Sequence, residues 1–165
     1  MIDLKEIKNK ILKKENFYSL VIILLTFLID RYSKFQILKN FSESIYYVND
    51  FLNFDLVWNT GIGFGLLNSN SDTVYAFISF LIGSVIIILF WVHLKSDKFD
   101  KITFSLIIGG AMGNFYDRLV LKAVPDFIDL HIKNFHWFTF NVADIFITIG
   151  VIIFLIKGFF IKDKT

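Results

Sequence analysis

Two aspartates flank the start of the last hydrophobic segment of the chain. Asp126 stands in the sequence Val-Pro-Asp-Phe, and Asp144 stands in Asn-Val-Ala-Asp. A carboxylate is costly to keep beside hydrocarbon, so an acidic residue in or next to a membrane span is by default a candidate for function. Two neighbouring carboxyl groups cannot both ionise easily and can share one proton. The pattern therefore favours proton chemistry carried by this pair.

One predicted helix carries glycines and polar residues on adjoining faces. Gly109 and Gly113 are four residues apart, which leaves one face without side chains and lets a neighbouring helix approach closely. Gly110, Asn114 and Asp117 follow one another at i, i+4 and i+7, so the two polar side chains point the same way. We expect this face to contact protein or water and not lipid.

Several charged residues also have simple structural interpretations. Asp117 stands beside Arg118, which favours an ion pair or a hydrogen-bond hub that ties the helix to the following loop. Asp30 and Lys34 have the i, i+4 spacing of a local ion pair, with the acid before the base. Asp30 is also expected at the same depth as Asp117, Asp126 and Asp144, near the outer edge of the membrane. A common site is therefore the alternative to local pairing.

Two asparagines stand where the chain is expected to turn. Asn59 opens Asn-Thr-Gly-Ile-Gly-Phe-Gly, in which Gly61 is the first of three alternating glycines that permit sharp turns. The segment lacks the Lys-Ser/Thr ending of a phosphate-binding loop, so we expect a re-entrant loop that displays the Asn59 amide, with a plain turn as the alternative. Asn141 precedes the last helix and Asp144 follows at its third position, which is also how an ordinary helix begins.

Other reactive groups offer weaker candidates. The chain has no cysteine, which excludes disulfides, thiolate metal sites and a cysteine nucleophile. His93, His131 and His136 lack the His-Glu-x-x-His spacing of a zinc helix, so a surface or interfacial role is favoured for them. No serine or threonine has the context of a nucleophile elbow. Metal-dependent and nucleophilic mechanisms are thereby disfavoured, and we expect neither a metal nor another cofactor.

The composition is that of a membrane protein. Hydrophobic residues make up 55% of the chain and the mean hydropathy is +0.61, whereas apolar residues with glycine reach only about half of an ordinary soluble domain. The 165 residues leave room for one integral membrane domain, 1–165. After a cytoplasmic lead at 1–15, we expect four membrane-spanning helices, at about 18–38, 73–93, 102–121 and 141–161.

The lysines predict the topology. They precede the first span, separate the second from the third and close the chain, whereas residues 41–94 contain neither Lys nor Arg. Basic residues beside spans tend to stay cytoplasmic, so both termini should be cytoplasmic. Strand-like segments at 44–48 and 54–58 predict a small extracytoplasmic β-sheet lying on the membrane surface, and 122–139 reads as an interfacial loop. The predicted fold class is membrane all-α with this small sheet.

Five motifs, taken in order, resemble those of the bacterial lipoprotein signal peptidases, the type II signal peptidases. They are Asp30-Arg31-Tyr32-Ser33-Lys34, then Asn59-x-Gly61-x-x-Phe64-Gly65, then Gly109-Gly110-Ala111-x-Gly113-Asn114-x-x-Asp117-Arg118, then Val124-Pro125-Asp126-Phe127, and finally Phe140-Asn141-x-Ala143-Asp144. The resemblance covers about residues 18–161. Pro125 departs from it, because the family more usually has a β-branched residue there. Since proline donates no backbone hydrogen bond, local strand pairing is in doubt.

The resemblance implies an aspartic endopeptidase whose catalytic dyad is Asp126 and Asp144. It implies supporting or substrate-binding roles for eight residues: Asp30, Lys34, Asn59, Gly61, Asn114, Asp117, Arg118 and Asn141. The implied substrate is a diacylglyceryl-modified prolipoprotein, cleaved before its lipidated cysteine, and the implied inhibitor is the cyclic peptide globomycin. We expect a monomer in the bacterial cytoplasmic membrane, in contact with membrane lipid and not with nucleic acid, with its active site near the extracytoplasmic face.

The residues suggest how the dyad would divide its roles. Asp144 stands in the first turn of a helix, where the positive end of the helix dipole favours its ionised form. It is therefore the expected base, and Asp126 is expected to start protonated. Coupled acids titrate as a pair, and the two roles exchange during turnover.

Two other functions fit part of the pattern. A small transporter or proton-relay protein could use Asp30, Asp117 and Asp144 as intramembrane carriers, but these acids gather at one edge and the second span has none. A protease of the presenilin or prepilin-peptidase kind would require a Gly-x-Gly-Asp motif, which the chain lacks.

Overall fold

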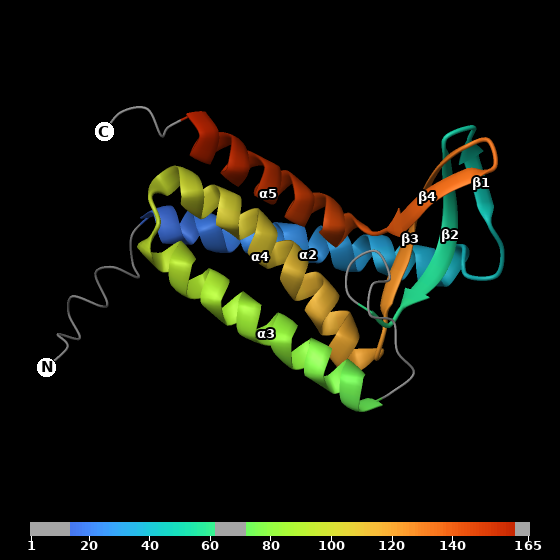
Figure 1. Ribbon diagram of the computed structural model, residues 1–165, viewed down its shortest axis with the longest axis horizontal. Coiled ribbons are helices and arrows are strands. Elements are labelled where there is room, and N and C mark those ends of the chain that lie inside the picture. The colour runs from blue at the N-terminus through green and yellow to red at the C-terminus, as the bar shows by residue number, and fades with distance from the viewer. Residues whose placement is uncertain (1–13, 62–71, 161–165) are drawn as a thin grey trace, which may run out of the picture.

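The computed structural model describes residues 14–61 and 72–160. These residues form four long helices and an antiparallel sheet that projects from one end of the helices (Figure 1). The helices are α2 (Lys14–Asn40), α3 (Asp72–Lys95), α4 (Lys98–Val120) and α5 (Val142–Phe160), and the strands are β1 (Tyr46–Asn49), β2 (Leu52–Asn59), β3 (Val124–Ile132) and β4 (Phe135–Phe140).

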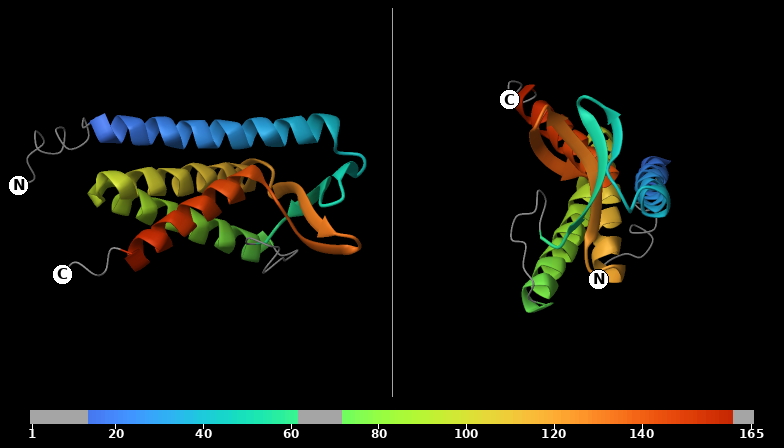
Figure 2. Two further views of the ribbon diagram at one scale, coloured as in Figure 1. Left: turned by 90° about the horizontal axis from the view of Figure 1, so that it is seen from above. Right: turned by 90° about the vertical axis from the view of Figure 1, so that its right-hand side faces the viewer.

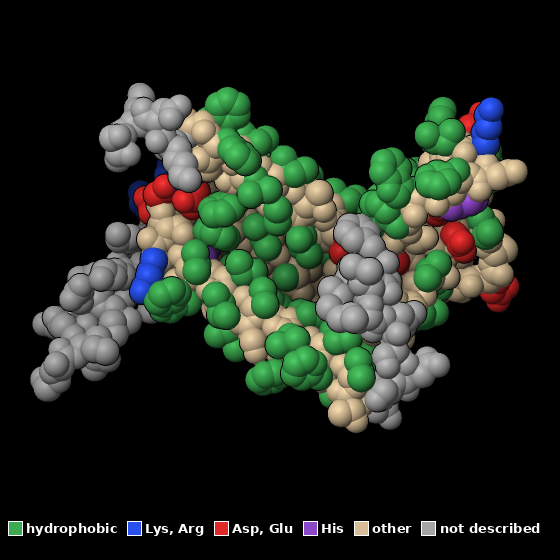
Figure 3. All heavy atoms as spheres, in the orientation of Figure 1, with side chains coloured by type: hydrophobic (Ala, Val, Ile, Leu, Met, Phe, Trp, Pro, Cys, Tyr) green, Lys and Arg blue, Asp and Glu red, His purple; other side chains and the backbone are tan. Residues whose placement is uncertain are grey.

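Each of the four predicted spans falls on one of these helices. Within the described residues, two helical segments, Thr73–Lys95 and Val142–Phe160, are long and apolar enough to cross a membrane. Their apolar side chains face outward: Phe80 and Ile87 are each 70% exposed. Figure 3 shows apolar side chains spread over the face formed by α3, α4 and α5. Such a surface suits a hydrocarbon environment, because contiguous apolar patches of this kind are rare on soluble monomers.

The central helix is α4, which packs against α2, α3 and α5. Its glycines permit this packing, as their spacing predicts. A Cβ atom at Gly109 would lie 2.8 Å from the carbonyl oxygen of Ile23 in α2, and one at Gly110 would lie 2.6 Å from the carbonyl oxygen of Ala143 in α5. Residues with side chains at these positions would push both neighbouring helices away from α4.

The sheet has the order β1-β2-β3-β4 with antiparallel neighbours. Its first two strands correspond to the predicted strand segments, and the side chain of Asn49 accepts a hydrogen bond from the backbone N–H of Phe51 (2.9 Å) in the turn between them. The prediction of an interfacial loop at 122–139 is wrong, because most of this segment is the β3–β4 hairpin. Lys133, with φ of 55°, occupies the left-handed conformation that a tight hairpin turn requires.

Pro125 does not prevent strand pairing. It is the second residue of β3 and lies opposite Trp58 of β2, close to the strand end where proline is tolerated. The pairing of β2 with β3 is irregular between Phe54 and Val57, where β2 carries an extra residue. Apart from that bulge, the two strands remain in register from Val124 to Leu130.

The ends of the helices divide into two groups. The first residue of α2, the last residue of α5 and the connection between α3 and α4 lie at the end of the helices away from the sheet (Figures 1 and 2). α2 runs along the whole length of the bundle and reaches the sheet at its far end (Figure 2). The polar site described below lies where the helices meet the sheet.

Candidate active site

Asp126 and Asp144 line one cavity of about 290 Å³, although they come from different elements. Asp126 is the third residue of β3, and Asp144 lies in the first turn of α5. Three of the predicted supporting side chains that line the same cavity carry amides, and one carries a guanidinium: Asn59, Asn114, Asn141 and Arg118. The remaining lining is mostly apolar, with Ile82, Val124 and Ile147 among its members.

The carboxylate of Asp126 is buried between two side-chain amides. Asn59 donates from Nδ2 to Oδ2 at 2.9 Å, and Asn141 donates from Nδ2 to Oδ1 at 2.6 Å. Burial raises the pKa of Asp126 to about 6, with a further contribution from the negative charge of Asp144, and the two amide hydrogen bonds oppose the rise. Asp126 therefore holds its proton at a higher pH than an ordinary aspartate.

Asp144 is fixed from both sides. Its Oδ1 accepts a hydrogen bond from Asn114 Nδ2 (2.8 Å), and its Oδ2 accepts one from the backbone N–H of Asn141 (3.1 Å). In return, the backbone N–H of Asp144 donates to Asn141 Oδ1 (3.2 Å). This reciprocal pair satisfies free amides at the start of α5, as in a capping box. Asn141 is thus both an ordinary helix cap and the residue that contacts both acids.

Lys34 is the centre of a buried network beside the cavity. Its ammonium donates to Asp30 (2.9 Å), Asn114 (2.7 Å) and Asp117 (2.7 Å), and its side chain is only 1% exposed. The predicted Asp30–Lys34 ion pair is therefore present, but it is one part of a larger cluster. Through Asn114, the network reaches the carboxylate of Asp144.

Asp117 does not pair with its neighbour Arg118. Its partners are Lys34 and Arg31, whose Nη2 lies 3.0 Å from Asp117 Oδ2. The prediction of an Asp117–Arg118 ion pair is wrong, because consecutive residues on a helix point in directions about 100° apart. Asp117 is a hydrogen-bond hub, as the alternative interpretation has it, but it ties α4 to α2 and not to the following loop. Arg31, which the sequence reasoning did not single out, stands next to Asp30 in the first motif.

Asp30 ties two helices together. Its Oδ1 accepts a hydrogen bond from the backbone N–H of Ala143 (3.0 Å), the residue before Asp144. The carboxylate lies directly against Gly113 of α4, where a Cβ atom would overlap it. Asp30 thus fixes the start of α5 against α2 and α4, and it does not line the cavity.

Arg118 and Gly61 connect the cavity to the segment after β2. Arg118 donates to the carbonyl oxygen of Gly61 (2.6 Å) and to that of Asn114 (3.3 Å). The backbone N–H of Gly61 donates to Asn59 Oδ1 (2.9 Å), so the chain turns at this point and directs the other end of the Asn59 amide to Asp126. The glycines at 63 and 65 lie outside the described residues.

Residues 22–160 match the family described as signal peptidase (SPase) II. The chain belongs to the signal peptidase II family. It is therefore a membrane protease of the aspartic, signal peptidase II type.

Two relatives and one solved structure show how far the similarity extends. The chain is 51% identical over 161 residues to a lipoprotein signal peptidase of Pelagibacter ubique (strain HTCC1062), covering 95% of this chain and 97% of the relative. It is 37% identical over 164 residues to one of Francisella tularensis subsp. novicida (strain U112), covering 95% and 99%. A solved bacterial membrane enzyme superposes with a TM-score of 0.72 at 31% identity, covering 90% of this chain and 93% of that one.

Replacing Lys34 by methionine should destabilise this signal peptidase II family member strongly. The substitution removes the most buried cation that Asp30 and Asp117 share, with the partly exposed Arg31 as their remaining cation among the described residues. Breaking a buried ion pair in this way costs roughly 3–5 kcal/mol. Chemical unfolding in detergent micelles, followed by tryptophan fluorescence, measures the change.

Lys157→Met is the matched control, because Lys157 also contacts two carboxylates, Asp97 and Asp100, but at more exposed positions. Solvent-accessible ion pairs contribute little to stability, so this variant should unfold nearly as the parent protein does. Equal losses in both variants would contradict the special role of the Lys34 network.

Proposed function

We propose that Asp126 and Asp144 are the catalytic pair with which this protease cleaves the signal peptides of lipoproteins. The observation that carries the proposal is that both carboxyl groups line one cavity, each held by side-chain amides. The substrate is a prolipoprotein whose cysteine already carries diacylglycerol, and cleavage falls before that cysteine. Family membership and the names of the relatives support lipoprotein precursors as substrates.

Asp126 starts protonated and Asp144 starts ionised. Burial holds the proton on Asp126, whereas Asp144 accepts a backbone hydrogen bond at the positive end of the α5 dipole. Asp144 takes a proton from a water molecule as the water oxygen attacks the scissile carbonyl carbon, and Asp126 gives its proton to the carbonyl oxygen. In the second step the tetrahedral intermediate loses its C–N bond, the leaving nitrogen receives a proton from Asp144, and a hydroxyl proton returns to Asp126.

Three neutral side-chain amides hold this pair directly. Asn59, Asn114 and Asn141 each donate an amide N–H to a carboxylate and cannot titrate. Asp30 and Lys34 act as positioning residues, because they reach Asp144 through Ala143 and Asn114 and not directly. Arg118 stabilises the turn after β2 and lines the cavity, where it is available to a substrate carbonyl.

An apolar groove beside Asp144 suits the acyl chains of the substrate. It encloses about 270 Å³ between β3, β4 and α5, and its lining contains aromatic and aliphatic side chains next to the carboxylate: Leu130, Phe138, Phe140, Ile145 and Ile149. A lipid-modified cysteine bound there would keep its hydrocarbon out of water while its peptide bond lies at the dyad. The same groove has no evident use in a transporter of small polar solutes.

All four helices cross the bacterial cytoplasmic membrane in this proposal, as one domain and one copy of the chain. Lys95, Lys98 and Lys157 belong to the helix ends away from the sheet (Figure 1), which supports a cytoplasmic position for that end and an extracytoplasmic sheet. The transporter alternative is disfavoured because the network of Asp30, Asp117 and Asp144 is confined to the sheet end of the bundle.

Either Asp126→Asn or Asp144→Asn should reduce cleavage by at least about a thousandfold, because each removes a group that transfers a proton in both steps. A gel-shift assay on purified, diacylglyceryl-modified prolipoprotein measures the effect, with protein that elutes as the parent does. Asp55→Asn, the same change in β2 of the same sheet and outside the cavity lining, should cleave normally. Near-normal cleavage by either dyad variant would reject the proposal.

The pH dependence should follow the proton on Asp126. Because the pKa of this carboxyl is raised to about 6, the protonated form dominates below that pH and is lost above it, so kcat/KM should fall as the pH rises through about 6. Asn59→Ala removes a hydrogen bond that favours the ionised form, which should raise the pKa and move the fall to higher pH. Asp55→Asn should leave it in place. If kcat/KM of Asn59→Ala fell at the same pH as that of the parent protein, the fall would reflect the titration of a group other than Asp126.

The topology is testable because the chain has no cysteine of its own. Two exposed positions can each take a single cysteine. Ser44→Cys places one in the segment before β1, and Lys98→Cys places one at the start of α4. A membrane-impermeant maleimide should label the first in intact spheroplasts and the second only after permeabilisation. The reverse pattern would invert the orientation, and labelling of both in intact spheroplasts would exclude an odd number of spans between them.

A further inference from the structure

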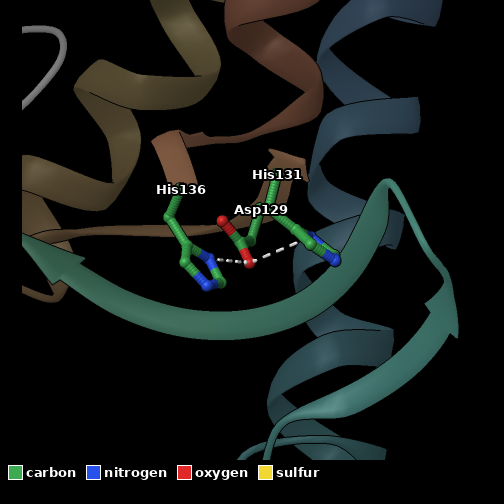
Figure 4. A group of neighbouring side chains, drawn as sticks. All are labelled: Asp129, His131 and His136. Atoms are coloured by element: carbon green, nitrogen blue, oxygen red, sulfur yellow. Dashed lines mark hydrogen bonds and ion pairs between the residues drawn. The ribbon is translucent and has the colours of Figure 1, made fainter. Parts of the chain in front are cut away.

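The β3–β4 hairpin carries a cluster of potential metal ligands that the proposed cleavage reaction does not use. Asp129 and His131 come from β3 and His136 comes from β4, and one ligand atom from each lies within 4.8 Å of the other two. Figure 4 shows the two imidazole rings on either side of the Asp129 carboxylate, with a nitrogen of each directed to the same oxygen.

Strand register creates this cluster. Asp129 and His131 are two residues apart, so their side chains project from the same face of β3. His136 is the direct partner of His131 across the hairpin, and the two rings stack with centroids 5.1 Å apart. The side chain of His131 is only 8% exposed, so of the two expected roles, surface or interfacial, the structure argues against an exposed surface position for this histidine.

Two buried acceptor atoms at the cluster lack hydrogen-bond partners among the described residues. His131 Nδ1 lies 3.6 Å from Asp129 Oδ2, too far for a hydrogen bond, and has no other partner. Asn53 Oδ1 is also buried without a partner, and its amide nitrogen lies 3.5 Å from the same carboxylate oxygen. A buried polar atom without a partner is costly, and a cation bound between Asp129, His131 and His136 would satisfy His131 Nδ1.

We propose that Asp129, His131 and His136 bind one divalent transition-metal ion, with zinc as the best fit. Zinc takes imidazole nitrogen and carboxylate oxygen ligands in tetrahedral geometry, and three protein ligands leave one position for water or a fourth ligand. Two imidazoles favour such an ion over Mg²⁺ or Ca²⁺, which prefer oxygen ligands. His136 is 55% exposed, so the ion has direct access from solvent.

The site is structural and separate from the dyad. Asp129 follows Asp126 by three residues, so the two side chains project from opposite faces of β3, and none of the three metal ligands lines the dyad cavity. A metal ion would cross-link β3 to β4. Since β3 also carries Asp126, the ion would stabilise the strand that presents this aspartate to the cavity.

Titration of the full chain in detergent with Zn²⁺ tests the proposal. The protein is purified without a polyhistidine tag, treated with a chelator and studied by calorimetry at about pH 7.5, because metal affinity depends on pH. We expect one zinc per chain. Asp129→Asn and His136→Ala should each weaken binding at least roughly tenfold, since even indirect contacts to metal ligands contribute ten- to a hundredfold. Millimolar Mg²⁺ should not compete.

Thr139→Ala is the matched control, because Thr139 pairs with Asp129 across the hairpin but offers no ligand in the cluster. It should bind zinc as the parent protein does. A second readout is thermal unfolding, in which zinc should raise the midpoint of the parent and of Thr139→Ala but not of the two ligand variants. No zinc binding by the folded parent, or equal binding by all four proteins, would overturn the proposal, and neither result bears on the Asp126–Asp144 dyad.

Discussion

The buried ammonium of Lys34 is the interaction on which the rest of the site depends. A charge inside a helix bundle is tolerated only when it is paired and fully hydrogen-bonded, and Lys34 meets this condition with Asp30, Asn114 and Asp117. These partners lie on α2 and α4, so the charge joins the two helices. From Asp30 the connection continues to the start of α5 through Ala143. The position of Asp144 is thus set by a network that begins on another helix.

The glycines of α4 belong to the same constraint. The Asp30 carboxylate can reach both Lys34 and Ala143 only because Gly113 has no side chain to occupy the space. Gly110 allows the carbonyl oxygen of Ala143 to approach α4 in the same way. Close helix contact and charge pairing therefore depend on each other, since larger residues on α4 would separate the ion pairs from their partners. This explains why glycines and charges occur together in the third motif.

The sequence predicted most of what depends on local pattern. Hydropathy placed the four helices, the glycine spacing indicated close packing of α4, and the position of Asp126 and Asp144 beside a helix start made them candidates. What it could not predict depends on contacts between distant segments. The partner of Asp117 is on α2 and not next to it, because helical geometry separates neighbours. The aromatic residues and histidines of the β3–β4 hairpin also suit a membrane interface, so the sequence favours a loop there. The cluster at Asp129 depends on strand register, which local pattern does not specify.

The asparagines explain how a carboxyl group can be buried here and still remain available for proton transfer. Burial alone drives the pKa of Asp126 upward, and the neighbouring charge of Asp144 adds to this rise. The amides of Asn59 and Asn141 oppose it by donating to the ionised form, so that the pKa of Asp126 comes to about 6.

An aspartate at either amide position would add a third negative charge and raise the pKa further, whereas an alanine would remove the opposing hydrogen bond. A lysine would favour the ionised form too strongly for Asp126 to start with a proton. Only a neutral donor keeps the pKa near the pH at which a proposed acid must both hold and release its proton. Asn141 has a second role in this balance, because the same residue caps α5 and holds Asp144. Asn141 therefore links the two acids through a residue that cannot change its charge.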